Sequence, residues 1–150
     1  MRRTSRLLSA ALVLTSLLTG CRREPPPPII PVEGVVLLKG KPLNKVQVRF
    51  IPQIDYGAEY IAVGVTDPNG RFKLMCNGEP GACAGKNLVL VAEDDIPKRL
   101  QGEDAQIELA EYFRKLGGRP IPIRYANPVD SSLSATVSEE QKEFVFKLEP

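Results

Sequence analysis

The chain of 150 residues contains no histidine and only three cysteines. Histidine is the commonest general base of enzymes, the usual partner of a nucleophilic serine and the commonest metal ligand. Its absence excludes hydrolysis of the serine–histidine type and argues against zinc, which needs several nitrogen or sulfur ligands. We therefore predict no cofactor, no metal site and no catalytic activity. A carboxylate-based enzyme is the remaining alternative, although adjacent acids such as residues 93–95 and 139–140 are more often solvated.

Long hydrophobic runs are also missing. The apolar segment at residues 7–18 is about a dozen residues long, whereas a helix that spans a bilayer needs roughly 20. Three arginines precede this segment, and the small residues Thr19 and Gly20 follow it. A basic start, a short apolar run and a small-residue end are typical of a signal peptide that is removed. We predict a signal peptide at residues 1–20 and a mature chain that begins at Cys21.

The four residues that end this segment, Leu18-Thr19-Gly20-Cys21, resemble the bacterial lipobox. The resemblance implies that the sulfur of Cys21 receives a diacylglyceryl group and that the new amine is then acylated. Two or three acyl chains make attachment effectively permanent, because each buried methylene contributes about 0.8 kcal/mol. In Gram-negative lipoproteins an aspartate at the next position resembles an inner-membrane retention signal, and here Arg22 follows. We expect a lipid-anchored envelope protein with the lipid bilayer as a partner, in the outer membrane and facing the periplasm or the surface. The alternative is an ordinary secretory signal with a chance cysteine.

A clustered excess of basic residues is missing too. Residues 1–20 carry three of the 20 lysines and arginines and none of the 18 acidic residues, so the mature chain has a net charge of −1. Nucleic-acid binding relies on a basic patch or stripe. We therefore predict no nucleic-acid partner.

Proline is concentrated after the predicted cleavage site, at residues 25–28 and again at Pro31. Consecutive prolines fix φ and lack a backbone donor, so they favour an extended polyproline II conformation. We predict a stiff tether at residues 21–31 that holds the domain roughly 30 Å from the membrane, at about 3.1 Å per residue. The alternative is that the proline run binds an aromatic-lined groove of a partner.

The remaining residues, 32–150, are enough for one domain. Apolar side chains alternate in several segments, as at Val46, Val48 and Phe50, and turn-forming residues separate these segments. One of the turns, Asp67-Pro68-Asn69-Gly70, is typical of a tight turn and lacks the full spacing of a calcium loop. We predict an all-β, seven-stranded antiparallel sandwich. Its strands are expected near residues 32–39, 45–52, 60–66, 71–76, 87–93, 133–138 and 143–149.

Residues 103–116 depart from this two-residue period. Leu109, Tyr112 and Phe113 recur at helical spacing, acids precede them, and basic residues and Gly117 follow. We predict one inserted amphipathic helix that covers an open edge or end of the sandwich. The alternative is a helix that binds a partner.

Four segments of the first half share a pattern: Val32-Glu33-Gly34-Val35-Val36, Gly40-Lys41-Pro42-Leu43, Val46-Gln47-Val48-Arg49-Phe50, and Thr66-Asp67 followed by Gly70-Arg71-Phe72-Lys73-Leu74. Together they resemble a carboxypeptidase regulatory-like domain, which implies a transthyretin-like Greek-key fold. That fold also includes hydroxyisourate hydrolase, whose catalytic histidines this chain lacks. In the second half, the inserted helix and the segments Ile121-Pro122-Ile123-Arg124-Tyr125 and Ser131-Ser132-Leu133 resemble small planctomycete-type lipoproteins, most of which have no assigned activity.

The two remaining cysteines, Cys76 and Cys83, flank a sequence suited to a loop between adjacent strands. The envelope beyond the inner membrane is oxidising, and an eight-residue ring closed by a disulfide gains about 2.5 kcal/mol in the chain-entropy model. A metal site needs more ligands, and redox-active pairs usually have two intervening residues. We predict a structural disulfide between Cys76 and Cys83.

Two classes of function remain. We favour a non-catalytic interaction module that binds an envelope protein or polysaccharide through sheet edges or end loops. The alternative is a purely structural spacer or assembly element. Sugar binding favours exposed aromatic rings, and Tyr56, Tyr60 and Tyr125 are the candidates. The loop at residues 53–59, with Tyr56 and the neighbouring Tyr60, is the candidate ligand site, and an ordinary connecting loop is its alternative.

Overall fold

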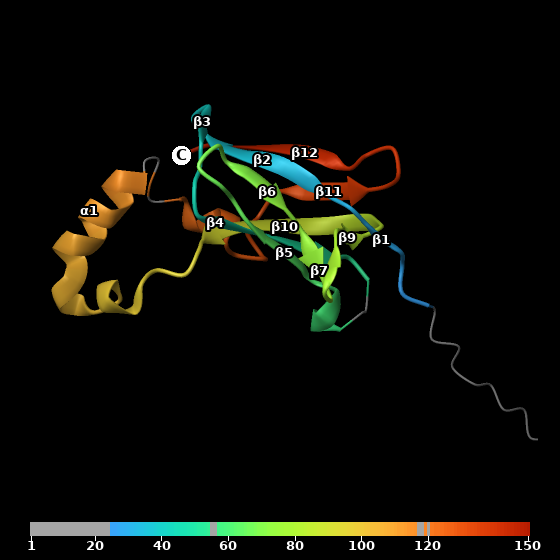
Figure 1. Ribbon diagram of the computed structural model, residues 1–150, viewed down its shortest axis with the longest axis horizontal. Coiled ribbons are helices and arrows are strands. Elements are labelled where there is room, and N and C mark those ends of the chain that lie inside the picture. The colour runs from blue at the N-terminus through green and yellow to red at the C-terminus, as the bar shows by residue number, and fades with distance from the viewer. Residues whose placement is uncertain (1–24, 55–56, 117–118, 120) are drawn as a thin grey trace, which may run out of the picture.

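The computed structural model describes residues 25–54, 57–116, 119 and 121–150, so Cys21 and Tyr56 lie outside the described residues. Most of the regular secondary structure in the described chain is β-sheet in two facing layers, with one short α-helix at one end (Figure 1). This arrangement is consistent with the predicted all-β sandwich.

The larger sheet is wholly antiparallel and has six strands. Their order across the sheet is β11 (Ser134–Val137), β10 (Gly85–Glu93), β4 (Val46–Pro52), β5 (Ala62–Val65), β7 (Met75–Cys76) and β8 (Glu79–Pro80). The longest pairing joins β10 to β4, from Asn87 opposite Pro52 to Glu93 opposite Val46. These two strands form the centre of the sheet.

The second sheet is built around β2 (Glu33–Leu38), which pairs with β12 (Glu143–Leu148), β3 (Lys41–Pro42) and β6 (Arg71–Lys73). The pairing of β2 with β12 is parallel, so the prediction of a purely antiparallel sandwich is wrong at this pair. A tight hairpin forces neighbouring strands to be antiparallel. No hairpin joins β2 to β12, because they come from opposite ends of the domain.

The strand count also differs from the predicted seven. The segment predicted as one strand at residues 71–76 is divided at Leu74, with β6 in one sheet and β7 in the other. Short strands β1 (Ile29–Ile30) and β9 (Ala82–Cys83) pair with each other in a third, two-stranded sheet. The other predicted strands have counterparts in β2, β4, β5, β10, β11 and β12.

The core between the two layers centres on Phe50 of β4, which is fully buried. Its ring contacts the rings of Phe72, Phe144 and Phe146, with centroid distances of 6.4, 5.6 and 5.9 Å. These three rings belong to β6 and β12 of the opposite sheet. Aromatic pairs at this spacing gain energy beyond the area they bury. The alternation predicted at residues 46–50 therefore supplies the contact that joins the two sheets.

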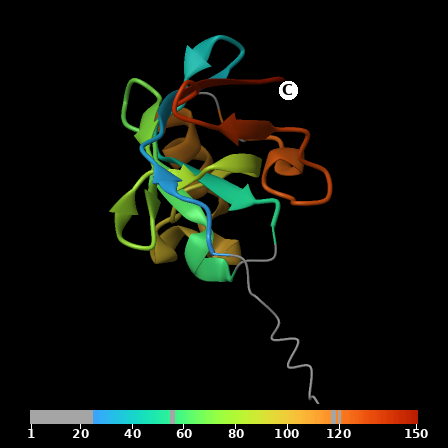
Figure 2. The ribbon, with the colours of Figure 1, turned by 90° about the vertical axis from the view of Figure 1, so that its right-hand side faces the viewer.

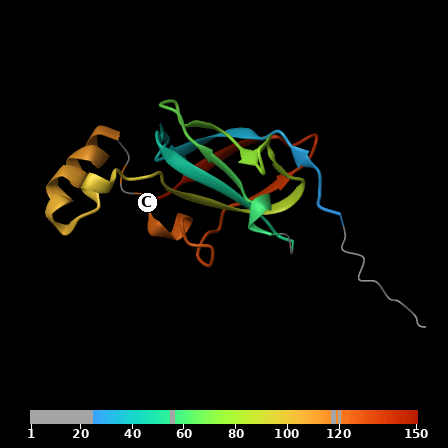
Figure 3. The ribbon, with the colours of Figure 1, turned by 60° about the horizontal axis from the view of Figure 1, so that its bottom comes forward.

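The predicted helix is present, as a 3₁₀ turn η3 (Glu103–Ala105) that leads into α1 (Gln106–Leu116). It packs on its own connection, against η3 and the 3₁₀ turn η2 (Lys98–Leu100), and none of its residues is buried. Figures 1 and 3 show α1 beyond one end of the sandwich, so it does not cover a sheet edge, which was one of its two expected positions. The fully buried Leu100 of η2 shows that this connection has a small apolar contact of its own.

A different segment of the same connection joins the core. Tyr125, in the 3₁₀ turn η4 (Ile123–Tyr125), is 5% exposed and belongs to the buried cluster. Its hydroxyl accepts a hydrogen bond from the backbone nitrogen of Glu149 at 2.9 Å, just after β12. Tyr125 is therefore a core residue rather than an exposed ring for a sugar.

Substitution of the central ring tests this account of the core. We expect Phe50→Ala to lower the free energy of unfolding by about 3–5 kcal/mol, because it removes a fully buried ring and leaves a cavity. Val145→Ala, on the exposed face of β12, is the matched control and should change stability by less than about 0.5 kcal/mol. Urea unfolding of both variants measures the difference. Equal stability of the two variants would contradict the central role of Phe50.

Candidate functional site

Two cysteine thiols lie side by side under the end of the sandwich from which the N-terminal segment emerges. Cys76 in β7 and Cys83 in β9 are fully buried, separate thiols that are close enough to hydrogen-bond each other. Both also point at the backbone oxygen of Tyr60, at 3.3 Å from the Cys76 Sγ and 3.8 Å from the Cys83 Sγ. The structure thus brings together the two cysteines that were predicted to pair, and the disulfide itself stays a prediction.

This environment makes both thiols poor nucleophiles. Burial, together with smaller effects of the neighbouring Cys83 and Glu79, raises the pKa of Cys76 to about 11. Burial also raises the pKa of Cys83, against an opposing hydrogen bond from Cys76. The thiolate is the form that attacks electrophiles and binds metals. At neutral pH the reduced pair is protonated, so its arrangement suits a structural role better than thiol catalysis.

The N-terminal segment lies directly on this cysteine pair. Strand β1 pairs with β9, with Ile29 opposite Cys83, and the nitrogen of Ala84 donates a hydrogen bond to the oxygen of Pro28 at 2.9 Å. In Figure 2 this segment, in blue, runs across the end of the sandwich that faces the viewer. Ile30 is buried in the core cluster. The folded domain therefore includes residues 28–31, which the sequence assigned to the tether.

Gly81 is the residue that permits this close approach. Its φ is +129°, and a Cβ at this position would lie 2.1 Å from the oxygen of Ile30. Only glycine adopts such a conformation readily and leaves room for the passing backbone. The sequence shows the glycine, but Ile30, the residue that passes it, is 51 positions away, and no local pattern points to this contact.

The predicted tyrosine site at Tyr56 and Tyr60 stays a prediction. Tyr60 is half-buried and packs against the core, and Tyr56 lies outside the described residues. Among the residues that the structure describes, the large exposed apolar side chains are aliphatic or methionine and none is aromatic. They are Ile54, Val65, Met75, Ile107, Ile123, Val129 and Val145.

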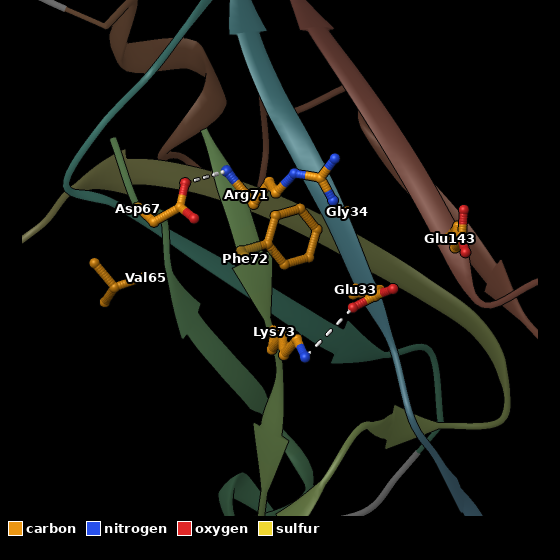
Figure 4. Close-up of a pocket in the computed structure, with 8 residues that line it drawn as sticks. All are labelled: Glu33, Gly34, Val65, Asp67, Arg71, Phe72, Lys73 and Glu143. Atoms are coloured by element: carbon orange, nitrogen blue, oxygen red, sulfur yellow. Dashed lines mark hydrogen bonds and ion pairs between the residues drawn. The ribbon is translucent and has the colours of Figure 1, made fainter. Parts of the chain in front are cut away.

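A groove of about 480 Å³ opens over the edge strand β6 (Figure 4). Lys73 of β6 and Glu33 of β2 form an ion pair across it at 3.7 Å, and Glu143 of β12 lies next to Glu33 in register. The groove floor contains Phe72 and Gly34. Charges of both signs line it, and exposed ion pairs of this kind contribute at most about 1 kcal/mol. The groove therefore offers a ligand only weak polar contacts.

Asp67 lies at the rim of the same groove, and its carboxylate is engaged in hydrogen bonds within its own turn. Its carboxylate accepts hydrogen bonds from the nitrogens of Asn69 at 2.8 Å and Arg71 at 3.0 Å. Its backbone oxygen accepts a further bond from Gly70, which has a positive φ. The structure therefore contains the tight turn that the sequence predicted at this position.

Two of the acidic residues that the sequence offered for acid–base chemistry form ion pairs. Glu93 forms an ion pair with Arg119, and Glu139 pairs with Lys142 at 2.6 Å. Across the described part of the chain, no group of three or more histidine, cysteine, aspartate or glutamate side chains is placed to hold a metal ion. No described helix has the length and apolar composition needed to span a membrane.

Arg119 is a structural residue that sequence reasoning missed. Its side chain is fully buried, and its guanidinium bonds to Glu93 and to the backbone oxygens of Asn44 and Lys45. The other Glu93 carboxylate oxygen accepts a bond from the nitrogen of Ile121 at 3.2 Å. A buried charge needs such partners to offset its lost hydration. Arg119 therefore ties the connection after α1 to the ends of β4 and β10.

Comparison of the chain with protein-family models, with curated proteins and with solved structures found no match. The resemblance to carboxypeptidase regulatory-like domains therefore rests on the residues quoted above alone.

The raised thiol pKa values predict a strongly pH-dependent alkylation of the reduced, folded protein. With a pKa of about 11 in place of 9.0, the thiolate fraction of Cys76 at pH 7 falls about a hundredfold, to roughly 10⁻⁴. We expect alkylation about a hundredfold slower in the folded than in the urea-unfolded chain. The folded rate should rise about tenfold per pH unit until near pH 11. Mass spectrometry of the alkylated tryptic peptide 74–86 measures the rate. Equal rates for the folded and unfolded chains at pH 7 would contradict this assignment.

Proposed function

We propose that this protein is a lipid-anchored module of the cell envelope, held at the outer membrane through an acylated Cys21, that binds another envelope protein without catalysis. The observation that carries the proposal is the placement of different segments at the two ends of the domain. The N-terminal segment leaves at one end, and α1 and its flanking turns lie at the opposite end (Figure 1). A tether attached at the first end would present the second end to other molecules.

The exposed side chains support a protein partner more than a polysaccharide. The three most exposed large apolar side chains, Ile107, Ile123 and Val129, are 79, 84 and 89% exposed, and all lie in the connection between β10 and β11. We infer that these side chains contribute to a protein-binding surface, because exposed apolar side chains are buried in protein contacts. Sugar binding would favour aromatic rings, and no large aromatic side chain is exposed among the described residues.

The transthyretin-like Greek-key connectivity also belongs to this proposal. It is supported by the four segments that carry the resemblance, because they supply β2, β3, β4 and β6 around the Phe50 cluster. The resemblance to carboxypeptidase regulatory-like domains does not cover the connection at residues 94–133.

The anchor is tested by Cys21→Ser. In wild-type protein purified from membranes, mass spectrometry should show a cleaved N-terminus with a diacylglyceryl group on Cys21. The Cys21→Ser chain should move from the membrane fraction to the soluble fraction, whereas Cys76→Ser should stay with the membrane. A wild-type N-terminus without acyl chains, or a membrane-bound Cys21→Ser chain, would contradict the anchor.

The interaction surface is tested by placing a photo-reactive amino acid at position 107 or 129 in intact cells. We expect a crosslinked envelope protein from these positions and none from position 79, an exposed control on β8 near the tether. The crosslink should weaken when Cys21→Ser removes the anchor. If position 79 gives the same product, the surface is wrong. Absence of any product would favour the structural spacer.

A further inference from the structure

We propose that the open edge of β12 binds the same edge of a second copy of this chain, in an antiparallel pairing centred on Val145. The pairing joins the second sheets of two sandwiches into one continuous sheet. It goes beyond the proposed function, and it does not rest on the lipid anchor.

Strand β12 lies at the edge of its sheet, and among the described residues β2 is its sheet partner. In Figure 4, β12 runs along the side of β2 that is away from β6. The backbone oxygens of Lys142 and Leu148 accept bonds, at 3.1 and 3.3 Å, from the start of β2 and from the residue after it. Backbone groups alternate in direction along a strand, so Glu143, Val145 and Lys147 direct theirs to the open side.

The open part of this edge is short. Beyond it, the backbone nitrogen of Glu149 donates to the hydroxyl of Tyr125 at 2.9 Å. At the start, the Gln141 side chain donates to the oxygen of Glu143 at 2.9 Å, and a carbonyl oxygen can accept a second bond. An unpaired edge is a template for another strand, and a short, charged edge restricts which strand can pair. The edge available to a partner is therefore residues 143–147.

The side chains on the outer face of this edge are complementary to themselves. Glu143, Val145 and Lys147 are all exposed, and Val145 is 60% exposed. When two copies pair antiparallel with Val145 opposite Val145, Glu143 of each copy lies opposite Lys147 of the other. A shift of two residues places Glu143 opposite Val145 or Glu149 instead. Opposite charges directly across a sheet stabilise it and like charges destabilise it, so the charges select the register centred on Val145.

Neither of these two charges is neutralised within one copy. In the part of the chain that the structure describes, Glu143 and Lys147 form no ion pair. Glu143 lies in register with Glu33, so this row of the outer face has two adjacent acids, and its one base, Lys73, pairs with Glu33 at 3.7 Å. Lys147 of a second copy supplies the base that Glu143 lacks.

The core side of the strand also favours closure. Phe144 contacts the central ring of Phe50 at 5.6 Å and stacks on Phe146 at 6.1 Å, yet it is only half-buried. The same register places Phe144 opposite Phe146 of the second copy, on the face that lines the core. Pairing would remove more of the Phe144 ring from water, which is favourable.

The pairing reverses one copy relative to the other. Because β12 and β2 are parallel, the N-terminal segments of the two copies leave at opposite ends of the joined sheet. If the lipid anchor is correct, the paired strands lie along the membrane. The connection between β10 and β11 of each copy then stays open at one end of the dimer.

Sedimentation equilibrium of the full chain carrying Cys21→Ser tests the association. We expect a reversible dimer with a Kd on the order of 10 µM, because one edge strand makes a small interface. Glu143→Lys and Lys147→Glu should each raise the Kd at least tenfold, because symmetry repeats the like-charge pair at both ends of the paired strands. Glu143→Lys/Lys147→Glu restores opposite charges and should return the Kd to that of the parent chain. Asp104→Lys, an equal charge change at an exposed residue of η3, is the control and should have no effect.

A cysteine at the symmetry axis tests the register. Directly opposed residues that exchange both backbone bonds have Cα atoms about 5.5 Å apart, within the range of a disulfide. With oxidised glutathione, Val145→Cys should give a covalent dimer whose crosslinked peptide joins position 145 to itself. Lys147→Cys should not, because the same residue of the other copy lies about 13 Å away along the strand.

Three results would overturn the proposal. One is a chain that stays monomeric at concentrations a hundred times the expected Kd. Another is a double charge exchange that associates as weakly as the single variants, since rescue shows that the single variants still fold. The third is a covalent dimer that forms as fast from position 147 as from position 145. Because every variant is compared in the Cys21→Ser chain, these outcomes are the same whether or not the anchor proposal holds.

Discussion

The contact between Phe50 and the three rings of the opposite sheet is the interaction on which the rest of the structure depends. Strand β4 pairs with both β5 and β10, so Phe50 projects from the middle of the larger sheet. Because side chains alternate along a strand, a slip of one residue would turn Phe50 out to solvent and bring Arg49 into the core. The register of β4 therefore determines which of its side chains face the core and which face solvent.

Different segments of the chain pack on the two ends of this sandwich. At one end the N-terminal segment is captured through β1, over a pair of protonated thiols. At the other end the long connection between β10 and β11 is held by the buried Arg119 and by Tyr125. Both ends rely on contacts between distant parts of the chain.

Much of the fold could be predicted, because its signals are local. Alternation at residues 46–50 and 143–149 and helical spacing at residues 103–116 each involve side chains two to four positions apart. The candidate site was predictable only in part. The spacing of Cys76 and Cys83 indicated a pair, but the docking of Ile30 on Gly81 and the burial of Arg119 left no local pattern.

By itself the sequence determined where the longer strands and the helix form, that no histidine chemistry is available, and that a signal-like segment precedes a proline-rich stretch. Only the tertiary structure decided that β12 lies parallel to β2, that α1 stands off the sandwich, and that residues 28–31 belong to the domain. The physical reason is one of range. Periodicity and turn chemistry act between near neighbours, whereas strand pairing and burial gain their energy from residues that meet only when the chain is folded.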